Sequence, residues 1–304
     1  MNVLVTGGLG YLGSEIVPAL LRRGDGVVIV DDFSRCAAVR PLQLTTSGLK
    51  VIKGDCTGGW LMHITDSYKI DAILLLAAVV GAPACEQEPD KAMAVNQIAV
   101  EKLAQALGQD RIVVYPNTTA GYVPKHDKAD ESCEMVGHTV YARTKIAAER
   151  VLLDKCGAVS LRLASVYGRS AAGVIRDDTF VNALAKQAVA GNVIKVVNPS
   201  HMRDIVHVRD VGRAFLHAID CFPWLRGHAY NVGERNLTKR LAARCVADQA
   251  SRIYAQIEEV DDADPDKRDF AVDHTLWRSK GFHYEMSFSA GLKDLLGALQ
   301  GVLT

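Results

Sequence analysis

Hydrophobic and polar positions follow two different periods along the first half of the chain. Short apolar runs, rich in β-branched residues, are each followed by a longer stretch of helical period. The apolar runs lie at 2–7, 26–32, 49–55, 71–78, 111–118 and 158–165. The helical stretches lie at 12–24, around 60–69, at 90–108 and at 138–156. This alternation predicts a doubly wound parallel sheet. The runs are apolar nearly throughout, as expected of strands covered on both faces.

The second half of the chain is less regular. It predicts helices over 177–191, 237–250 and 281–299, and a strand that leads into a helix over 203–220. We therefore predict an α/β protein with two parts. A Rossmann-fold domain comprises residues 1–167 and also includes the segment 204–232. A smaller, discontinuous α/β substrate-binding domain takes the rest of 168–304.

Composition narrows the classes of function. The 304 residues are 49% hydrophobic, and 35 basic side chains balance 35 acidic ones. This balance gives no reason to expect nucleic acid or an anionic membrane as partner. The apolar run 72–82 is too short to span a bilayer, and no signal-peptide pattern opens the chain. Seven scattered cysteines without a CxxC predict reduced thiols in a cytoplasmic protein, and no His, Cys, Asp or Glu spacing predicts a metal site.

The first apolar run leads directly into a glycine-rich stretch, "VTGGLGYLGSE". Gly8, Gly10 and Gly13 give the GxGxxG spacing, and Gly7 and Gly10 also satisfy a looser GxxGxxG. Glycines there permit a tight turn, a close approach to a pyrophosphate and close packing of helix on strand. A turn that merely needs glycine is the rival interpretation, but the strand–turn–helix context favours a dinucleotide site.

Acidic residues follow the second and third runs. Asp31 comes about 20 residues after the loop, where a carboxylate accepts hydrogen bonds from the adenosine ribose and repels a 2′-phosphate. NAD is therefore favoured over NADP, although Arg35 is a counter-signal. Asp55 ends the third run and either meets the adenine amino group or caps a helix.

Tyr141 precedes Lys145 by four residues within the helical stretch 138–156, so both side chains share one helix face. A phenol has an ordinary pKa of about 10, and a nearby ammonium favours its anionic form. We expect Tyr141 to act as a general base on a substrate hydroxyl and Lys145 to lower its pKa. The motif alone is weak, but it follows a dinucleotide loop and a strand that ends in Asn117, Thr118 and Thr119. Thr118 would hydrogen-bond the reacting oxygen, with a threonine-rich turn as the rival interpretation.

These motifs together resemble the extended short-chain dehydrogenase/reductase family of nucleotide-sugar epimerases, dehydratases and dehydrogenases. "LLLAA", "YPNTTAGY", "YARTK", "LRLASVYG", "RDIVHVRDV" and "AYNVG" occur in the order of that family over nearly the whole chain. The resemblance implies NAD as cofactor, a nucleotide-diphosphate sugar as substrate, catalytic residues Thr118, Tyr141 and Lys145, and a homodimer formed by the helices around 91–107 and 138–155.

The resemblance also implies roles at particular positions. It places these residues at NAD: Gly7, Gly10, Tyr11, Leu12, Asp31, Asp32, Asp55, Cys56, Leu76, Ala77, Ala78, Val80, Asn96, Tyr141 and Lys145. It places these at the substrate: Thr118, Thr119, Ser165, Asn182, Arg203 and Arg268. Asn96 is expected to kink its helix. Two guanidiniums suit a diphosphate, although an ion pair is the rival role for each arginine. His207 is expected to make a structural hydrogen bond.

Departures from the family pattern narrow the reaction. Thr118 is followed by Thr119-Ala120, where 4,6-dehydratases carry Asp-Glu, so dehydration is disfavoured. "AAVVGAPACEQEP" and "DPDKRDF" are similar to GDP-heptose 4-dehydrogenases of polysaccharide biosynthesis. The main prediction is therefore a 4-dehydrogenase of that type, and the alternative is a 4-epimerase that uses the same 4-keto sugar. A non-catalytic NAD-binding regulator and a reductase of apolar alcohols are further alternatives, disfavoured by the intact Tyr–Lys pair and by the two arginines.

Overall fold

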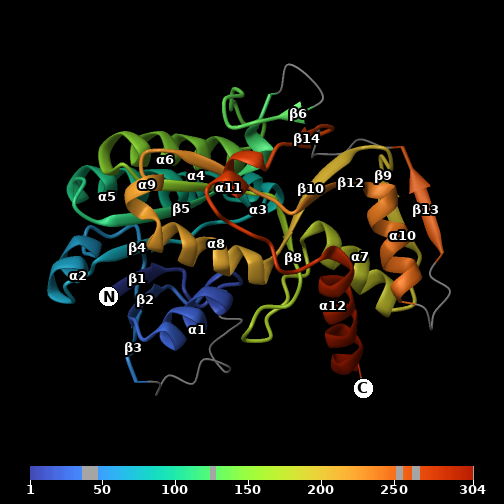
Figure 1. Cartoon of the computed structure of the whole chain (residues 1–304), viewed down its shortest axis with the longest axis horizontal. Coiled ribbons are helices and arrows are strands. Elements are labelled where there is room, and N and C mark those ends of the chain that lie inside the picture. Colours follow the sequence, from blue (N-terminus) through green and yellow to red (C-terminus); the bar gives the residue numbers. More distant parts are fainter. Residues whose placement is uncertain (36–46, 124–127, 251–255, 262–267, 304) are drawn as a thin grey trace.

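The computed structural model describes residues 1–35, 47–123, 128–250, 256–261 and 268–303. Its larger part is built on a seven-stranded parallel sheet of order β11-β7-β5-β4-β1-β2-β3 (Figure 1). The strands are β1 (Asn2–Thr6), β2 (Gly26–Asp31), β3 (Leu49–Lys53), β4 (Ala72–Leu75), β5 (Ile112–Thr118), β7 (Val159–Leu163) and β11 (Ala229–Val232). The first six of these fall within the six predicted apolar runs, so the doubly wound α/β prediction is confirmed.

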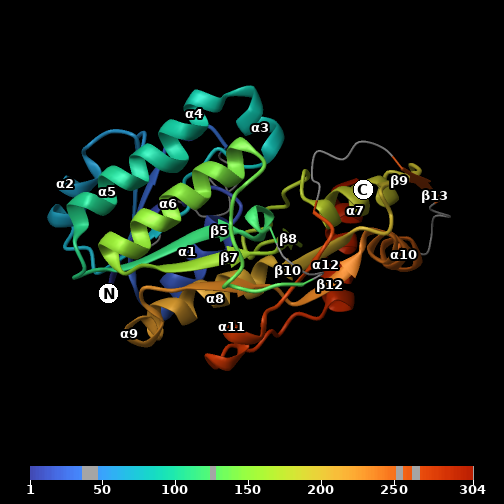
Figure 2. The same ribbon diagram turned by 90° about the horizontal axis from the view of Figure 1, so that it is seen from above.

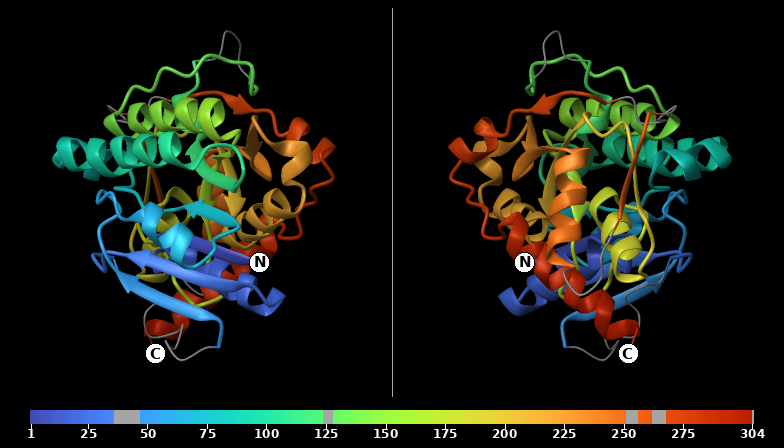
Figure 3. Two further views of the ribbon diagram at one scale, coloured as in Figure 1. Left: turned by 90° about the vertical axis from the view of Figure 1, so that its left-hand side faces the viewer. Right: turned by 90° about the vertical axis from the view of Figure 1, so that its right-hand side faces the viewer.

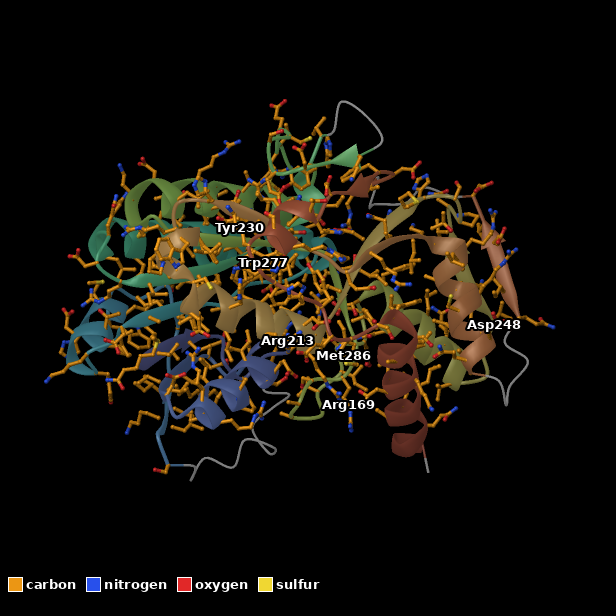
Figure 4. All side chains as sticks on the ribbon, viewed as in Figure 1. Arg169, Arg213, Tyr230, Asp248, Trp277 and Met286 are labelled. Carbon is orange, nitrogen blue, oxygen red and sulfur yellow. The ribbon has the colours of Figure 1, made fainter. Side chains whose placement is uncertain are left out.

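Helices cover both faces of this sheet (Figure 2). One face carries α1 (Gly13–Arg23), α8 (Val208–Asp220), α9 (Phe222–Leu225) and α11 (Thr275–Ser279); the other carries α2 (Leu61–Ser67), α5 (Ala99–Leu107) and α6 (Val140–Cys156). Side chains alternate along each strand, so Val3 and Val5 pack into the first core and Leu4 into the second. On the first face, the rings of Tyr230 and Trp277 pack with centroids 5.3 Å apart (Figure 4).

One strand departs from the predicted burial. β3 has three half-buried and two exposed residues instead of being covered on both faces. It lies at the edge of the sheet and, within the described ranges, pairs only with β2, so fewer helices reach it.

The helical stretch 90–108 is not one regular helix. After α3 (Ala82–Gln87) it consists of α4 (Pro89–Met93), a π-helical turn (Ala94–Ile98) and α5. The buried Asn96 lies in that turn, where its Oδ1 accepts the Val79 amide at 2.8 Å and its Nδ2 donates to the Val79 carbonyl at 2.9 Å. This bond pair fixes the segment after β4 against the interrupted helix.

As far as the structure describes it, the smaller part contains two short sheets and three helices. β8 (Ser165–Tyr167), β10 (Met202–His207) and β12 (Arg235–Thr238) form one sheet, and β9 (Ile194–Val197) pairs with β13 (Ile257–Val260). Around them pack α7 (Phe180–Val189), α10 (Lys239–Gln249) and α12 (Phe288–Leu303), which face the viewer in Figure 3, right. Within 204–232, β11 joins the large sheet, whereas β10 stays in the small one. The domain boundary at residue 167 remains a prediction.

A further excursion links the two parts. After β5 comes a 3-10 turn (Thr119–Gly121), and β6 (Lys128–Ala129) then pairs in parallel with β14 (Ala271–Val272). This pairing brings residues 270–272 against α6, at the side of the large sheet. No helix in the described ranges is long and apolar enough to cross a membrane.

Candidate active site

A cleft opens at the carboxyl edge of the large sheet, beside the point where the strand order reverses between β1 and β4. Open α/β sheets bind ligands at such points. The cleft measures about 1180 Å³, which exceeds the ~300–1,000 Å³ that ordinarily holds one small ligand. The glycine loop and the ends of β2 to β4 line one half, and β8, residues 174–180 and residues 268–270 line the other. Its volume and its two unlike halves fit a dinucleotide beside a second molecule.

The backbone requires glycine at two positions of the loop after β1. Gly7 has a φ of 67°, and a Cβ there would lie 2.7 Å from both the Cα and the N of Ala77. A Cβ on Gly13, the first residue of α1, would collide with the carbonyl group of Gly8. The loop therefore brings the positive end of α1 close to the cleft, where it favours a phosphate group.

Two carboxylates stand at the ends of β2 and β3. Asp31 is 8% exposed and lines the cleft; its oxygens accept the Leu9 amide at 3.0 Å and the Phe33 amide at 2.9 Å. Each carboxylate oxygen has a further lone pair, so ribose hydroxyls can still donate to it. Asp55 also lines the cleft, and its Oδ1 accepts the Thr57 amide at 2.8 Å. Asp55 thus closes a turn and does not cap α2, which was the rival role.

Three elements bring the predicted catalytic residues together. Helix α6 begins after Thr139, whose Oγ1 accepts the Ala142 amide at 3.1 Å, and it carries Tyr141 and Lys145 into the cleft lining. Thr118, at the end of β5, lines the same cleft, and its Oγ1 accepts the Ala120 amide at 3.1 Å. A hydroxyl that accepts in this way keeps its own proton to donate.

The charges around Tyr141 differ from those expected. Burial raises the pKa of the Tyr141 phenol, and the cation that opposes this most strongly is Arg176, followed by Arg268. Burial also lowers the pKa of the Lys145 ammonium to about 7, against the opposing charge of Glu149. In the chain alone, burial thus outweighs the nearby charges at both groups, and the lowering of the Tyr141 pKa by Lys145 remains a prediction.

Cations line the other half of the cleft. Arg203 of β10 is 3% exposed, and its Nη1 donates to the Met202 carbonyl at 2.7 Å and the Arg268 carbonyl at 2.5 Å. The Arg268 guanidinium lies 3.7 Å from the buried Asp204. Arg268 thus takes part in an ion pair, as the rival interpretation held, but it is half-buried and also lines the cleft. With Lys239 and Arg176, four cationic side chains of the described residues line this half.

Most of the predicted ligand-binding residues line the cleft. Besides the catalytic three and the two arginines, these are Gly7, Gly10, Tyr11, Leu12, Asp31, Asp32, Asp55, Cys56, Leu76, Ala77, Ala78, Val80 and Ser165. Three others do not. Asn96 is 1% exposed behind the cleft wall, where it holds Val79. It therefore shapes the wall and does not touch a ligand.

Thr119 and Asn182 are also buried behind the wall. Thr119 is fully buried and donates its hydroxyl to the Leu163 carbonyl at 3.4 Å, because the chain turns into a 3-10 helix immediately after Thr118. Asn182 is fully buried in α7; its Oδ1 accepts the Gly168 amide at 2.8 Å and its Nδ2 donates to the Arg176 carbonyl at 2.9 Å. Both predictions of direct substrate contact are corrected.

Two cations of the smaller part that line the cleft were missed from the sequence. Arg176 precedes α7 and makes a paired contact with Asp178 at 2.5 and 2.8 Å, and Lys239 opens α10 and donates to the Val197 carbonyl at 2.9 Å. No local spacing signals either residue, since both reach the cleft from the smaller part. His207, as expected, makes a structural bond: its Nδ1 accepts the Arg209 amide at 3.2 Å.

Comparison with known proteins identifies the family. A sequence profile described as "NAD dependent epimerase/dehydratase family" matches residues 3–233. The chain belongs to this family. Its NAD-dependent members act on nucleotide sugars, which agrees with the dinucleotide half and the cationic half of the cleft.

Relatives of known function support the same assignment. The UDP-glucose 4-epimerase of Mycolicibacterium smegmatis is 30% identical over 249 residues, covering 77% of each chain. That of Erwinia amylovora is 26% identical over 277 residues, covering 77% of this chain and 78% of its own. In fold, the chain is similar to the UDP-glucuronic acid 4-epimerase of Bacillus cereus, solved with UDP-glucuronic acid and NAD (TM-score 0.87, 20% identity, 99% and 100% of the two chains).

Proposed function

We propose that this epimerase/dehydratase family member is a nucleotide-sugar 4-epimerase. The observation that carries the proposal is a single cleft in which Thr118, Tyr141 and Lys145 face a wall with four cationic side chains. The named relatives favour the epimerase over the 4-dehydrogenase of GDP-heptose type, because those just compared are UDP-sugar 4-epimerases. The substrate proposed first is accordingly a UDP-hexose.

The residues present fit NAD. The glycine loop would hold the pyrophosphate, Asp31 the adenosine ribose, and Tyr141 and Lys145 would stand at the nicotinamide end. NAD, when bound, would accept the hydride that leaves C4 of the sugar and would later give the same hydride back to C4. Its positive charge also favours the phenolate form of Tyr141, which burial alone disfavours.

The chain's own groups move the proton and hold the sugar. Tyr141 takes the proton of the C4 hydroxyl while the C4–H bond breaks, so that C4 and its oxygen become a ketone. Thr118 donates a hydrogen bond to that oxygen. Arg203 and Arg268 hold the diphosphate while the sugar turns over, and Tyr141 returns the proton to the oxygen when C4 is reduced from its opposite face.

Product analysis tests the proposal. Purified protein with NAD is offered UDP-, GDP-, CDP- and dTDP-hexoses, and the products are analysed by ion-exchange chromatography and NMR. We expect the C4 epimer, no net accumulation of NADH, and, in D₂O, no deuterium at C4, because the hydride never exchanges with solvent. A released ketone with stoichiometric NADH would instead establish the 4-dehydrogenase, and deuterium at C4 would exclude a hydride mechanism.

A matched pair of variants tests the role of Tyr141. Tyr141→Phe should reduce turnover by about 10²- to 10⁴-fold while NAD binding persists, because it removes only the proton carrier. Tyr68→Phe makes the same change at a 37% exposed tyrosine after α2, outside the cleft lining, and should turn over normally. Undiminished turnover by Tyr141→Phe would refute the assigned base. Absence of turnover by the wild type with every sugar nucleotide would favour the non-catalytic regulator.

A further inference from the structure

Lys145 is held from its buried side by an aromatic ring. The residue is 2% exposed, and its Nζ lies 3.8 Å from the centroid of the Tyr115 ring, well inside the ~6 Å reach of a cation–π interaction. Tyr115 is 1% exposed in β5, and its hydroxyl donates to the Lys145 carbonyl at 3.4 Å. The ring is therefore packed in the core and tied to the turn of α6 that carries the lysine.

Glu149 supplies a negative charge one helical turn beyond Lys145. Residues four apart on a helix share a face, so Tyr141, Lys145 and Glu149 form one row along α6. The Glu149 side chain is 3% exposed, and three side chains hold its carboxylate in place. Its carboxylate accepts from Arg162 Nη2 at 2.7 Å, Asn117 Nδ2 at 2.7 Å and Ser160 Oγ at 2.5 Å.

The same network reaches the third catalytic residue. Asn117, which donates to Glu149, accepts the backbone amide of Thr118 with its Oδ1 at 2.8 Å. Glu149 thus lies behind both Lys145 and Thr118. A carboxylate held by an arginine on β7 and an asparagine on β5 cannot move away when the ligands in the cleft change.

We propose that Tyr115 and Glu149 are positioning residues that keep the amine of Lys145 charged and fixed at the cleft. Tyr115 does so through the face of its ring, and Glu149 through a buried charge that its own partners hold still. The proposal goes beyond the 4-epimerase reaction and depends on it only for the use to which Lys145 is put.

The other groups near Lys145 do not replace the contacts that Tyr115 and Glu149 provide. Cys85 of α3 acts on it, but burial raises the pKa of that thiol, so it remains neutral. Tyr141, one turn earlier, is likewise neutral in the chain alone because burial raises its pKa. Arg162 lies beyond Glu149 and is paired with it. Burial already brings the pKa of Lys145 down to about 7, so loss of the Tyr115 ring or of the Glu149 charge should lower that pKa further.

The test follows the titration of Lys145 directly. Protein labelled with lysine carrying ¹³C at Cε is titrated by NMR without NAD or substrate, and the Lys145 signal is assigned with Lys145→Arg. Tyr115→Phe keeps the ring and should leave the midpoint unchanged. Tyr115→Leu removes the ring and should lower the midpoint by about one pH unit. Glu149→Gln should lower it by one unit or more. A midpoint that stays in place in both latter variants overturns the proposal.

A second series preserves the shape of the core. Phenylalanines with increasing numbers of ring fluorines, incorporated at position 115, keep the volume nearly constant while they remove the negative potential of the ring face. We expect the Lys145 midpoint to fall stepwise along the series, and a flat series contradicts the role of the ring. Neither titration requires turnover. A shifted midpoint in a protein without epimerase activity would support the positioning role of Tyr115 and Glu149 and refute the proposed function. An active epimerase with a flat series would support the function and refute the positioning role.

Discussion

Replacing Gly7 by alanine tests the geometry of the cleft floor. The new methyl group would have to adopt the positive φ of 67° and would lie 2.7 Å from the backbone of Ala77. The left-handed conformation costs about 1–2 kcal/mol, and overpacking against backbone that cannot rotate away adds about 1–3 kcal/mol. Gly7→Ala should therefore lower the free energy of unfolding by about 2–5 kcal/mol. Because Ala77 lines the cleft, NAD affinity should also fall about tenfold or more.

Gly24→Ala is the matched control. Gly24 ends α1 with a φ of 89°, but a Cβ there meets nothing within 4 Å, and the residue is not part of the cleft lining. It should lose only the conformational part, about 1–2 kcal/mol, and should bind NAD normally. Urea unfolding gives both stabilities and isothermal titration calorimetry gives both affinities. If Gly7→Ala is no less stable than Gly24→Ala and binds NAD equally well, the argument from close approach of the loop to Ala77 is refuted.

Two further predictions concern pH. Arg176 lowers the pKa of Tyr141, so Arg176→Met should move the acidic limb of kcat/KM to higher pH by roughly half to one unit, whereas Arg176→Lys should largely keep it; a limb that does not move contradicts this electrostatic role. His207 is fully buried, and burial lowers its pKa from 6.5 to about 4. Between these two pH values the His207 imidazole is protonated in the unfolded chain but not in the folded one. The contribution of His207 to the free energy of unfolding is therefore fully present above pH 6.5, and up to about 3 kcal/mol is lost as the pH approaches 4. His207→Gln should flatten this acid slope in urea unfolding, and an equally steep slope would show that other groups cause it.

Local spacing predicted the parts of the site that are contained in single turns. The strand, glycine loop and helix from Asn2 to Arg23 follow from one apolar run and three glycines, and the pair Tyr141 and Lys145 follows from helical geometry alone. The row continues to Glu149, and the same i, i+4 spacing would have indicated it. These features need no knowledge of the rest of the chain.

The direction of side chains at strand ends was harder to predict. Thr118 and Thr119 are adjacent, yet only Thr118 lines the cleft, because the 3-10 turn after β5 sends its neighbour into the core. The place of Arg176 depends on how the smaller part packs against the large sheet. Its effect on Tyr141 joins segments 35 positions apart, which no local period encodes.

The hydrogen bond from Arg203 to the carbonyl of Arg268 couples the positions of the two arginines that line the cleft. The Arg203 side chain would carry charge for the proposed substrate, and it also anchors the backbone from which the second cation projects. A change in how this chain binds a nucleotide diphosphate should therefore require substitutions in pairs, and a single exchange at either arginine should weaken binding.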